Sequence, residues 1–338
     1  MWSEIEAALG GRVVRSEPMS RHTTFRIGGP ADWFIEATSA DDLHDIVLLA
    51  RRNQVRYFIL GGGSNLLVSD AGVRGLVILN KARQFKFQMS SLNSQTGGEP
   101  VGSDLAQAST PQVQVESGVI LPTLARECIE RGLTGLEWSI GVPGTLGGAV
   151  VGNAGAHGSD IARSLIWATI LDADGSVRDW APAELQFGYR SSVLKSQTPG
   201  LRVTHGQGAS VANRQSQTAR PIVLAAALEL KPSTREECEA RAAEFTEKRK
   251  RTQPPGATIG SMFKNPPGGY AGQLIEAAGL KGARAGNAEI SNVHANFFVN
   301  LGGASAADMN SLISLARERV KTMCGVELEL EIQLVGEW

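Results

Sequence analysis

Two glycine clusters constrain the fold of this chain more than any other feature of its sequence. Three consecutive glycines, Gly61–Gly63, follow the strand-like segment 57–60, and seven more glycines lie between Gly141 and Gly158. The second cluster contains no Asp, Glu, Lys or Arg but several aliphatic residues, which is not typical of a flexible linker. We expect two closely packed sets of turns whose free backbone N–H groups can approach an anion.

Neither cluster matches a common nucleotide-binding motif. Gly61 and Gly63 fit the start of Gly-x-Gly-x-x-Gly, but Leu66 occupies the third glycine position and a strand is expected to follow. A P-loop is excluded because no Gly-Lys-Ser/Thr follows. One glycine loop alone would be read as a turn, whereas two such loops favour a cofactor that carries a pyrophosphate.

Composition excludes several classes of protein. The 338 residues suggest two or three domains, and a net charge of -1 provides no basic excess for dedicated nucleic-acid binding. The longest apolar stretch, Ile222–Leu230, is too short for membrane insertion, and the N-terminus lacks the pattern of a signal peptide. Three scattered cysteines give neither a disulfide framework nor a metal site, and Cys128 and Cys324 are expected to be buried. We therefore expect a cytoplasmic protein without a metal.

Hydrophobic periodicity predicts the main elements. Helices are expected from Ser39 to about residue 53, from Leu121, over 234–251 and over 305–324; strands are expected at 57–60, 66–68, 76–79, 113–115, 326–335 and in a hairpin at 165–180. The polar stretches near 87–111 and 196–220 lack periodicity, and we interpret them as surface insertions, the first as a long mobile loop.

The C-terminal region carries the clearest signals. Ser305 and Asp308 form a capping box, an apolar face runs from Met309 to Met323, and Gly325 ends the helix. In the closing strand, alternation is expected to place Glu327, Glu329, Glu331 and Gln333 on one face.

Several motifs then follow one another in a characteristic order. They are Thr23–Asp32, Leu60–Leu67, Ile140–Ala149 with Asn153–Ala156, Phe187–Ser191, Gly260–Pro266, Ala271–Gly282 and His294–Phe297. Together they resemble the UDP-N-acetylenolpyruvoylglucosamine reductases, flavoenzymes of peptidoglycan precursor synthesis. The chain departs from that pattern at Gly152, where many relatives have Met, and at His157, where many have an aromatic residue.

The resemblance implies an α+β protein with the FAD-binding fold of the vanillyl-alcohol oxidase or PCMH type. Two α+β subdomains would hold FAD, and a C-terminal α+β domain would bind the substrate. We expect the first subdomain at 1–84, joined by the C-terminal strand 325–338, the second at 85–230 with both insertions, and the substrate-binding domain at 231–324. A monomer or weak oligomer is expected.

The resemblance also implies a reaction. NADPH would reduce a non-covalently bound FAD, which would transfer hydride to the β-carbon of UDP-N-acetylglucosamine enolpyruvate and yield UDP-N-acetylmuramate. Ser261 would donate the proton to the α-carbon. Arg190 and Glu331 would lie on either side of the enolic carboxylate, with Glu331 selected over Glu329 by the family's C-terminal pattern.

Other residues would bind the two ligands. The resemblance assigns FAD contacts to Gly61, Gly62, Gly63, Ser64, Asn65, Leu66, Gly141, Gly144, Thr145, Gly147, Gly148, Asn153 and Gly155. It assigns substrate contacts to Tyr189, Arg190, Lys264 and Asn265. Some members of this family have an additional segment whose tyrosine covers the bound substrate. No tyrosine lies in either insertion of this chain, so we expect the subtype without such a lid. The insertion at 196–220 is therefore not expected to cover the substrate.

Two alternatives stay open at the level of the sequence. A carbohydrate or alcohol oxidase would keep the fold and the cofactor, although His157 lies outside the pattern expected for a tethering histidine. A non-catalytic flavin or nucleotide-sugar binding module would keep the glycine loops but would not need Ser261, Arg190 and Glu331 together.

Overall fold

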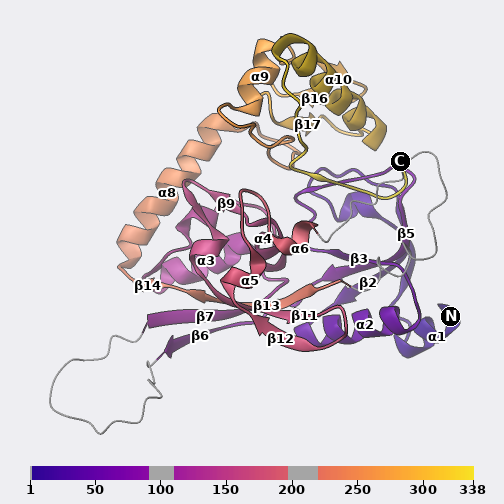
Figure 1. Cartoon of the computed structure of the whole chain (residues 1–338), viewed down its shortest axis with the longest axis vertical. Coiled ribbons are helices and arrows are strands. Elements are labelled where there is room, and N and C mark those ends of the chain that lie inside the picture. Colours follow the sequence, from indigo (N-terminus) through magenta and orange to yellow (C-terminus); the bar gives the residue numbers. More distant parts are fainter. Residues whose placement is uncertain (1, 91–109, 197–219) are drawn as a thin grey trace, which may run out of the picture.

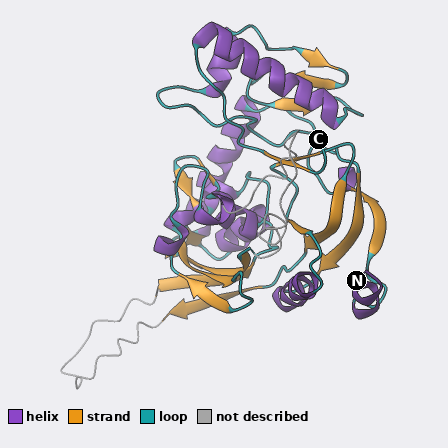
Figure 2. Cartoon of the chain, turned by 45° about the vertical axis from the view of Figure 1, so that its right-hand side comes forward, coloured by secondary structure: helices purple, strands orange, loops and turns teal. Residues whose placement is uncertain are grey.

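The computed structural model describes residues 2–90, 110–196 and 220–338. Two sheets and their helices form the larger part of the molecule (Figure 1), and the long helix α8 (Arg235–Thr252) leads from them to a separate C-terminal lobe. The turned view in Figure 2 shows the same lobe facing both sheets. None of the helices in these ranges is long and apolar enough to span a lipid bilayer.

The first sheet has four strands in the order β1-β2-β5-β3, with β2 and β3 parallel to β5 and β1 antiparallel to β2. Its elements are α1 (Trp2–Ala8), β1 (Val14–Pro18), β2 (Pro30–Ala37), α2 (Ala40–Arg52), β3 (Tyr57–Leu60) and β5 (Val73–Asn80). The predicted start of a helix at Ser39 is confirmed: Ser39 Oγ accepts the Asp42 N–H at 3.1 Å and caps α2.

A short strand from each end of the chain lies beside this sheet. β4 (Leu66–Val68) pairs in parallel with β18 (Gln333–Val335). Val68 and Val335 are both fully buried, in a cluster that includes Phe34 of β2. The end of the chain is thereby anchored next to the first glycine cluster, which immediately precedes β4.

The second sheet is antiparallel, with five strands in the order β12-β11-β13-β7-β6. Its strands and the helices that cover one face are β6 (Phe85–Ser90), β7 (Thr110–Glu116), α3 (Leu121–Glu130), α4 (Leu146–Gly152), β11 (Leu165–Leu171), β12 (Val177–Trp180), α5 (Pro182–Leu185) and β13 (Ile222–Glu229). The predicted hairpin at 165–180 and the predicted helix from Leu121 are confirmed.

Helix α2 packs between the two sheets. Leu43 and Ile46 of α2 share a buried cluster with Ile78 of β5 and Leu224 of β13. The two sheets are thus joined by a common apolar layer and form one body.

The predicted long loop at 87–111 is wrong at both ends. Residues 85–90 and 110–116 form the paired strands β6 and β7, with Phe87 opposite Val113. Phe85 and Phe87 pack against the buried cluster of the second sheet, and polar residues alternate with them. The segment forms a strand because this apolar face is buried on the sheet. Residues 91–109, and most of the predicted insertion at 196–220, lie outside the described part of the chain.

The second glycine cluster is more regular than the predicted set of turns. It contains the helix α4, whose N-cap Thr145 accepts the Gly148 N–H through Oγ1 at 3.5 Å. Leu146, Ala149 and Val150 of this helix are buried. Their burial against the second sheet outweighs the low helix propensity of glycine.

The C-terminal lobe contains α9 (Ala271–Ala277), α10 (Ala306–Cys324) and a small sheet of β15 (Arg284–Ala285), β16 (Ala288–Ile290) and β17 (Phe298–Asn300). The predicted capping box of Ser305 and Asp308 and the left-handed Gly325 that ends α10 are confirmed. Met323 and Cys324 are exposed, contrary to expectation, because the buried face of α10 ends at Val320. Shorter elements complete the chain: η1 (Met19–Arg21), β8 (Leu133–Thr134), η2 (Glu137–Ser139), β9 (Gly155–Ala156), β10 (Ser159–Asp160), η3 (Ile161–Arg163), α6 (Val193–Ser196) and β14 (Lys231–Pro232).

The predicted closing strand at 326–335 is only partly formed. Before β18, the chain instead follows the segment 262–264: Lys264 N–H donates to Glu329 O at 2.8 Å and Glu331 N–H donates to Met262 O at 3.0 Å. The alternating glutamates therefore do not share one solvated face. The segment contacts the lobe first and the first sheet afterwards, and this change of partner bends it.

Candidate active site

A cavity of about 1690 Å³ opens where the two sheets and the C-terminal lobe meet. Both glycine clusters line it, together with residues of α8, the segment 258–261 and the segment 329–334. Sites for one small ligand usually measure about 300–1,000 Å³. This cavity is therefore large enough for a dinucleotide cofactor and a second ligand.

The two glycine clusters contact each other in the wall of the cavity. A Cβ at Gly62 would lie 3.2 Å from Gly144 Cα, and a Cβ at Gly61 would lie 2.6 Å from Thr145 Oγ1. Ser64 Oγ donates to Pro143 O at 3.0 Å and connects the two loops. Glycine is favoured at both positions because an added side chain would displace Thr145 or crowd the backbone of Gly144.

The first loop presents unused donors. Within the described residues, the backbone N–H groups of Gly62, Gly63, Ser64 and Asn65 donate to no protein acceptor. Four consecutive amides of this kind form a cradle suited to a phosphate group. The donor set therefore fits the diphosphate of FAD, which the sequence predicts.

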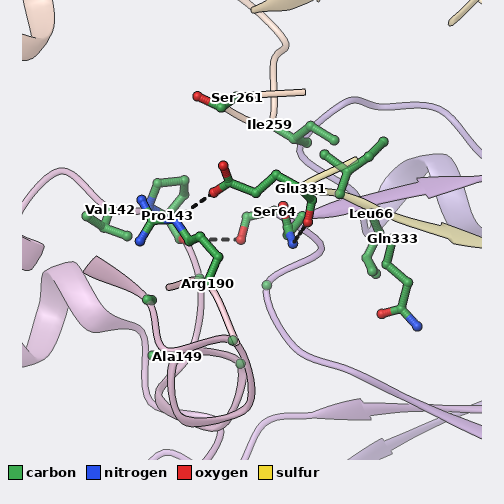
Figure 3. Close-up of a pocket in the computed structure, with 18 of the residues that line it drawn as sticks. Ser64, Leu66, Val142, Pro143, Ala149, Arg190, Ile259, Ser261, Glu331 and Gln333 are labelled. Carbon is green, nitrogen blue, oxygen red and sulfur yellow. Dashed lines mark hydrogen bonds and ion pairs between the residues drawn. The ribbon is translucent and has the colours of Figure 1, made fainter. Parts of the chain in front are cut away.

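Arg190 and Glu331 meet in the cavity. They lie 141 residues apart in the sequence, yet Arg190 Nε donates to Glu331 Oε1 at 2.7 Å. Their side chains are 27% and 15% exposed, so the pair is partly shielded from water. Figure 3 shows the Glu331 side chain lying between Arg190 and Ser261. Glu329 instead forms an ion pair with Lys264, with its side chain 71% exposed.

Ser261 lines the same cavity. It forms an isolated bridge with Phe297, and the next residue, Met262, donates its N–H to Asn296 O at 2.7 Å. These contacts with the lobe fix the backbone of Ser261. Its hydroxyl donates to no acceptor in the described part of the chain, so it is available to a ligand.

Comparison with known proteins identifies the family. A family model described as "UDP-N-acetylenolpyruvoylglucosamine reductase, C-terminal domain" matches residues 252–335, and one described as "FAD binding domain" matches residues 31–180. The UDP-N-acetylenolpyruvoylglucosamine reductase of Rubrobacter xylanophilus is 42% identical over 95% of this chain and 94% of that protein. The Bacillus subtilis reductase is 36% identical over 98% of this chain and 97% of its own length.

The chain belongs to the UDP-N-acetylenolpyruvoylglucosamine reductase family.

A solved structure of this family agrees with the fold. The UDP-N-acetylenolpyruvylglucosamine reductase of Thermus caldophilus is 35% identical, covers 96% of this chain and 99% of its own, and superposes with a TM-score of 0.70. The predicted fold class, an α+β protein with the PCMH-type FAD-binding fold, is confirmed. The prediction of an FAD-dependent oxidoreductase is confirmed at the level of the family.

The predicted cofactor residues of this reductase line the cavity with one exception. Those that line it are Gly61, Gly62, Gly63, Ser64, Asn65, Leu66, Gly141, Gly144, Thr145, Gly147, Gly148 and Gly155. Asn153 does not. It ends α4 in a left-handed conformation, is buried, and donates from Nδ2 to Gly188 O at 3.0 Å. Its contacts join α4 to the turn that carries Arg190.

The predicted substrate residues are not all brought together. Arg190 and Asn265 line the cavity, whereas Tyr189 and Lys264 are not among the residues that line it. Tyr189 is 58% exposed, and Lys264 is engaged with Glu329. Asn265 also accepts the Ala271 N–H through Oδ1 at 3.1 Å and so helps to start α9.

Sequence reasoning missed several charged residues of the cavity. Lys195, Arg220 and Arg249 all line it, and burial lowers the pKa of each. Arg249 packs against Gly141, where an added Cβ would lie 2.6 Å from Arg249 Cδ. The signal that could have indicated this contact is the glycine at position 141, which leaves space for the long side chain of Arg249.

Three polar atoms along the wall remain unsatisfied. Thr258 Oγ1, His157 Nε2 and Trp338 Nε1 are buried and have no hydrogen-bond partner among the residues described. All three residues line the cavity. The His157 ring stacks on Phe245 at 4.3 Å, and its pKa is lowered by burial and then by Arg249. Buried polar atoms normally have partners, so these are consistent with ligands that fill the cavity.

Proposed function

We propose that this protein reduces UDP-N-acetylglucosamine enolpyruvate to UDP-N-acetylmuramate, with FAD bound non-covalently and NADPH as the hydride donor. The observation that carries the proposal is the meeting of Arg190, Glu331 and Ser261 in the cavity that the two glycine clusters line. The proposal also includes two predictions made from the sequence. One is that the domains divide at residues 84, 230 and 324, and the other is that the protein acts in the cytoplasm.

The glycine clusters would hold the cofactor. The free N–H groups of Gly62–Asn65 would bind its diphosphate. FAD bound there supplies the hydride chemistry, as acceptor from NADPH and donor to the β-carbon of the substrate. The remaining tasks, binding the carboxylate and delivering a proton, fall to side chains of this chain.

Arg190 would bind the carboxylate of the enolpyruvyl group. Among the described residues, Glu331 takes only the Nε–H of Arg190, so the two terminal nitrogens stay available. A guanidinium can hold a carboxylate through two parallel hydrogen bonds and stabilise the negative charge that develops beside it. Glu331 would orient Arg190 and keep its plane fixed.

Ser261 would deliver the proton to the α-carbon. Its hydroxyl has no competing acceptor in the described chain and lies on the side of Glu331 away from Arg190 (Figure 3). A serine is a weak acid, so proton transfer depends on placement next to the carbon where charge develops. Water at the open side of the cavity would restore the proton.

One spectroscopic experiment tests the proposal. The purified protein should show oxidised-flavin absorption that bleaches with NADPH under anaerobic conditions and returns on addition of the enolpyruvyl substrate. Extraction with acid should release the flavin, because it is not covalently attached. Flavin that oxygen reoxidises rapidly, while the enolpyruvyl substrate has no effect, would favour an oxidase and contradict the proposal.

A further inference from the structure

The turn that carries Arg190 has a conformation that its own residues disfavour. Gly188 N–H donates to Ser191 O at 3.0 Å and Ser191 N–H donates to Gly188 O at 3.2 Å, which closes a tight turn. Arg190 lies inside the turn with a φ of 54°. In this left-handed region a side chain is crowded by its own backbone, so surrounding contacts must hold a non-glycine residue there.

Two side chains supply such contacts. Asn153 Nδ2 donates to Gly188 O at 3.0 Å, and Lys195 Nζ donates to Arg190 O at 3.0 Å. The bond from Lys195 acts on the peptide unit that follows Arg190. It therefore fixes the backbone of the residue whose side chain must reach Glu331.

The surroundings of Lys195 show that the Arg190 carbonyl is its partner. Lys195 belongs to α6, is partly buried and lines the cavity. Within the described residues it has no carboxylate within ion-pair distance; the partner of its ammonium group is the Arg190 carbonyl. Burial and the nearby charge of Lys264 lower the pKa of Lys195, so the site disfavours its charge. A lysine held in this partly buried position, with a backbone carbonyl as the partner of its side chain, indicates a specific task.

We infer that Lys195 is a positioning residue for the proposed reaction: it holds the Arg190 carbonyl and so maintains the left-handed turn that directs Arg190 toward Glu331. The inference rests on the proposed function, because Arg190 matters through the substrate carboxylate. Lys195 differs from the catalytic set in acting through the backbone of another residue.

The first test separates the two halves of the reaction. Lys195→Met removes the donor and retains most of the side-chain volume. Reoxidation of the reduced flavin by the enolpyruvyl substrate should fall about 10- to 100-fold, the usual effect of a small misplacement. Reduction of the flavin by NADPH and the flavin content should stay near the values of the unmodified protein. Lys195→Arg, which keeps a donor of sufficient length, should recover most of the rate.

A double-mutant cycle then identifies the route of the effect. If Lys195 acts through Arg190, adding Lys195→Met to Arg190→Met should change substrate-dependent reoxidation by no more than about twofold. Losses that multiply in the double variant would overturn the inference, since Lys195 would then contact the substrate independently. Lys321→Met on the exposed side of α10 is the matched control and should behave like the unmodified protein.

Folding and function stay distinguishable in this design. If Lys195→Met does not fold, Lys195→Gln replaces it, because a glutamine is too short to reach the Arg190 carbonyl. A slow Lys195→Gln variant together with a fast Lys195→Arg variant would support the inference. Equal rates in these two variants would overturn it. Loss of flavin in every Lys195 variant would indicate a structural role and also overturn it. Failure of the unmodified protein to turn over the substrate would contradict the proposed function instead.

Discussion

At the scale of single residues, two glutamates of the same short segment have different surroundings. Both line the cavity, but Glu331 lies against Arg190 with its side chain 15% exposed, whereas the side chain of Glu329 is 71% exposed and pairs with Lys264. A charge-assisted bond that is shielded from water contributes more than an exposed ion pair. This contrast provides a matched pair of variants.

Glu331→Gln should slow turnover, and Glu329→Gln should not. Loss of a charge-assisted hydrogen bond costs about 1.5–3 kcal/mol, which corresponds to about 10- to 150-fold in rate. The exposed ion pair of Glu329 with Lys264 contributes about 0–1 kcal/mol. Steady-state kcat with both variants checks this; the opposite order of effects would show that Glu329 is the functional carboxylate.

Ser261→Ala should separate the two half-reactions. The hydroxyl is needed for protonation of the α-carbon, so transfer to the enolpyruvyl substrate should fall about 10²–10⁴-fold. Flavin reduction by NADPH needs no such proton and should be nearly unchanged. Stopped-flow absorption measures both steps. Equal losses in the two steps would mean that Ser261 maintains the fold of its segment. Ser261→Thr is a second variant, which keeps a hydroxyl at this position.

At the scale of elements, α4 shows why glycine recurs in the second cluster. A Cβ at Gly147 would lie 3.0 Å from Ser117 Cβ and 3.1 Å from Ser117 O. Ser117 cannot withdraw easily, because its carbonyl accepts the Gly147 N–H at 2.8 Å and its hydroxyl accepts from Asn80 at 2.7 Å. At Gly152, in the same helix, nothing lies within 4 Å of an added Cβ. The two glycines therefore serve different purposes.

Gly147→Ala should destabilise the protein and reduce its flavin content, whereas Gly152→Ala should not. Overpacking against Ser117 costs about 1–3 kcal/mol and displaces the start of α4. Alanine at position 152 gains helix propensity, up to about 1 kcal/mol. The ratio of flavin to protein absorption and a urea unfolding curve measure both effects. Full flavin content in the Gly147 variant would contradict the role of this close approach.

At the scale of the whole molecule, the cavity lies between three buried clusters. The first sheet, the second sheet and the C-terminal lobe each have a core of their own, and residues from all three line the cavity. A cofactor bound there would contact all three parts of the molecule at once. Its binding energy would therefore add directly to the stability of the native state.

Removal of the flavin should lower the melting temperature. A ligand present at 100 times its dissociation constant stabilises the native state by about 2.7 kcal/mol, which corresponds to on the order of 5 °C in a protein of this size. Scanning calorimetry of the stripped protein, with and without added FAD, measures the shift. Riboflavin, which lacks the diphosphate, is the control and should restore little. An unchanged melting temperature would contradict binding of the diphosphate by the glycine loops.

Local features were predictable from the sequence because their physics is local. The cap at Ser39, the capping box at Ser305 and the stop at Gly325 each depend on a few neighbouring residues and form as expected. The glycine clusters likewise predicted close backbone approach. Family motifs, which combine many such local features in order, identified the fold class and the reductase family.

Tertiary structure alone decided the features that depend on distant partners. The closing strand bends because it pairs first with residues 262–264 and then with β4, and no local pattern encodes that change. Asn153 faces Gly188 and not the cavity, because the turn beyond it provides the acceptor. Arg190 reaches Glu331 across 141 residues and is held by Lys195 in a left-handed turn. Such pairs depend on how the sheets and the lobe pack, and packing is a property of the whole chain.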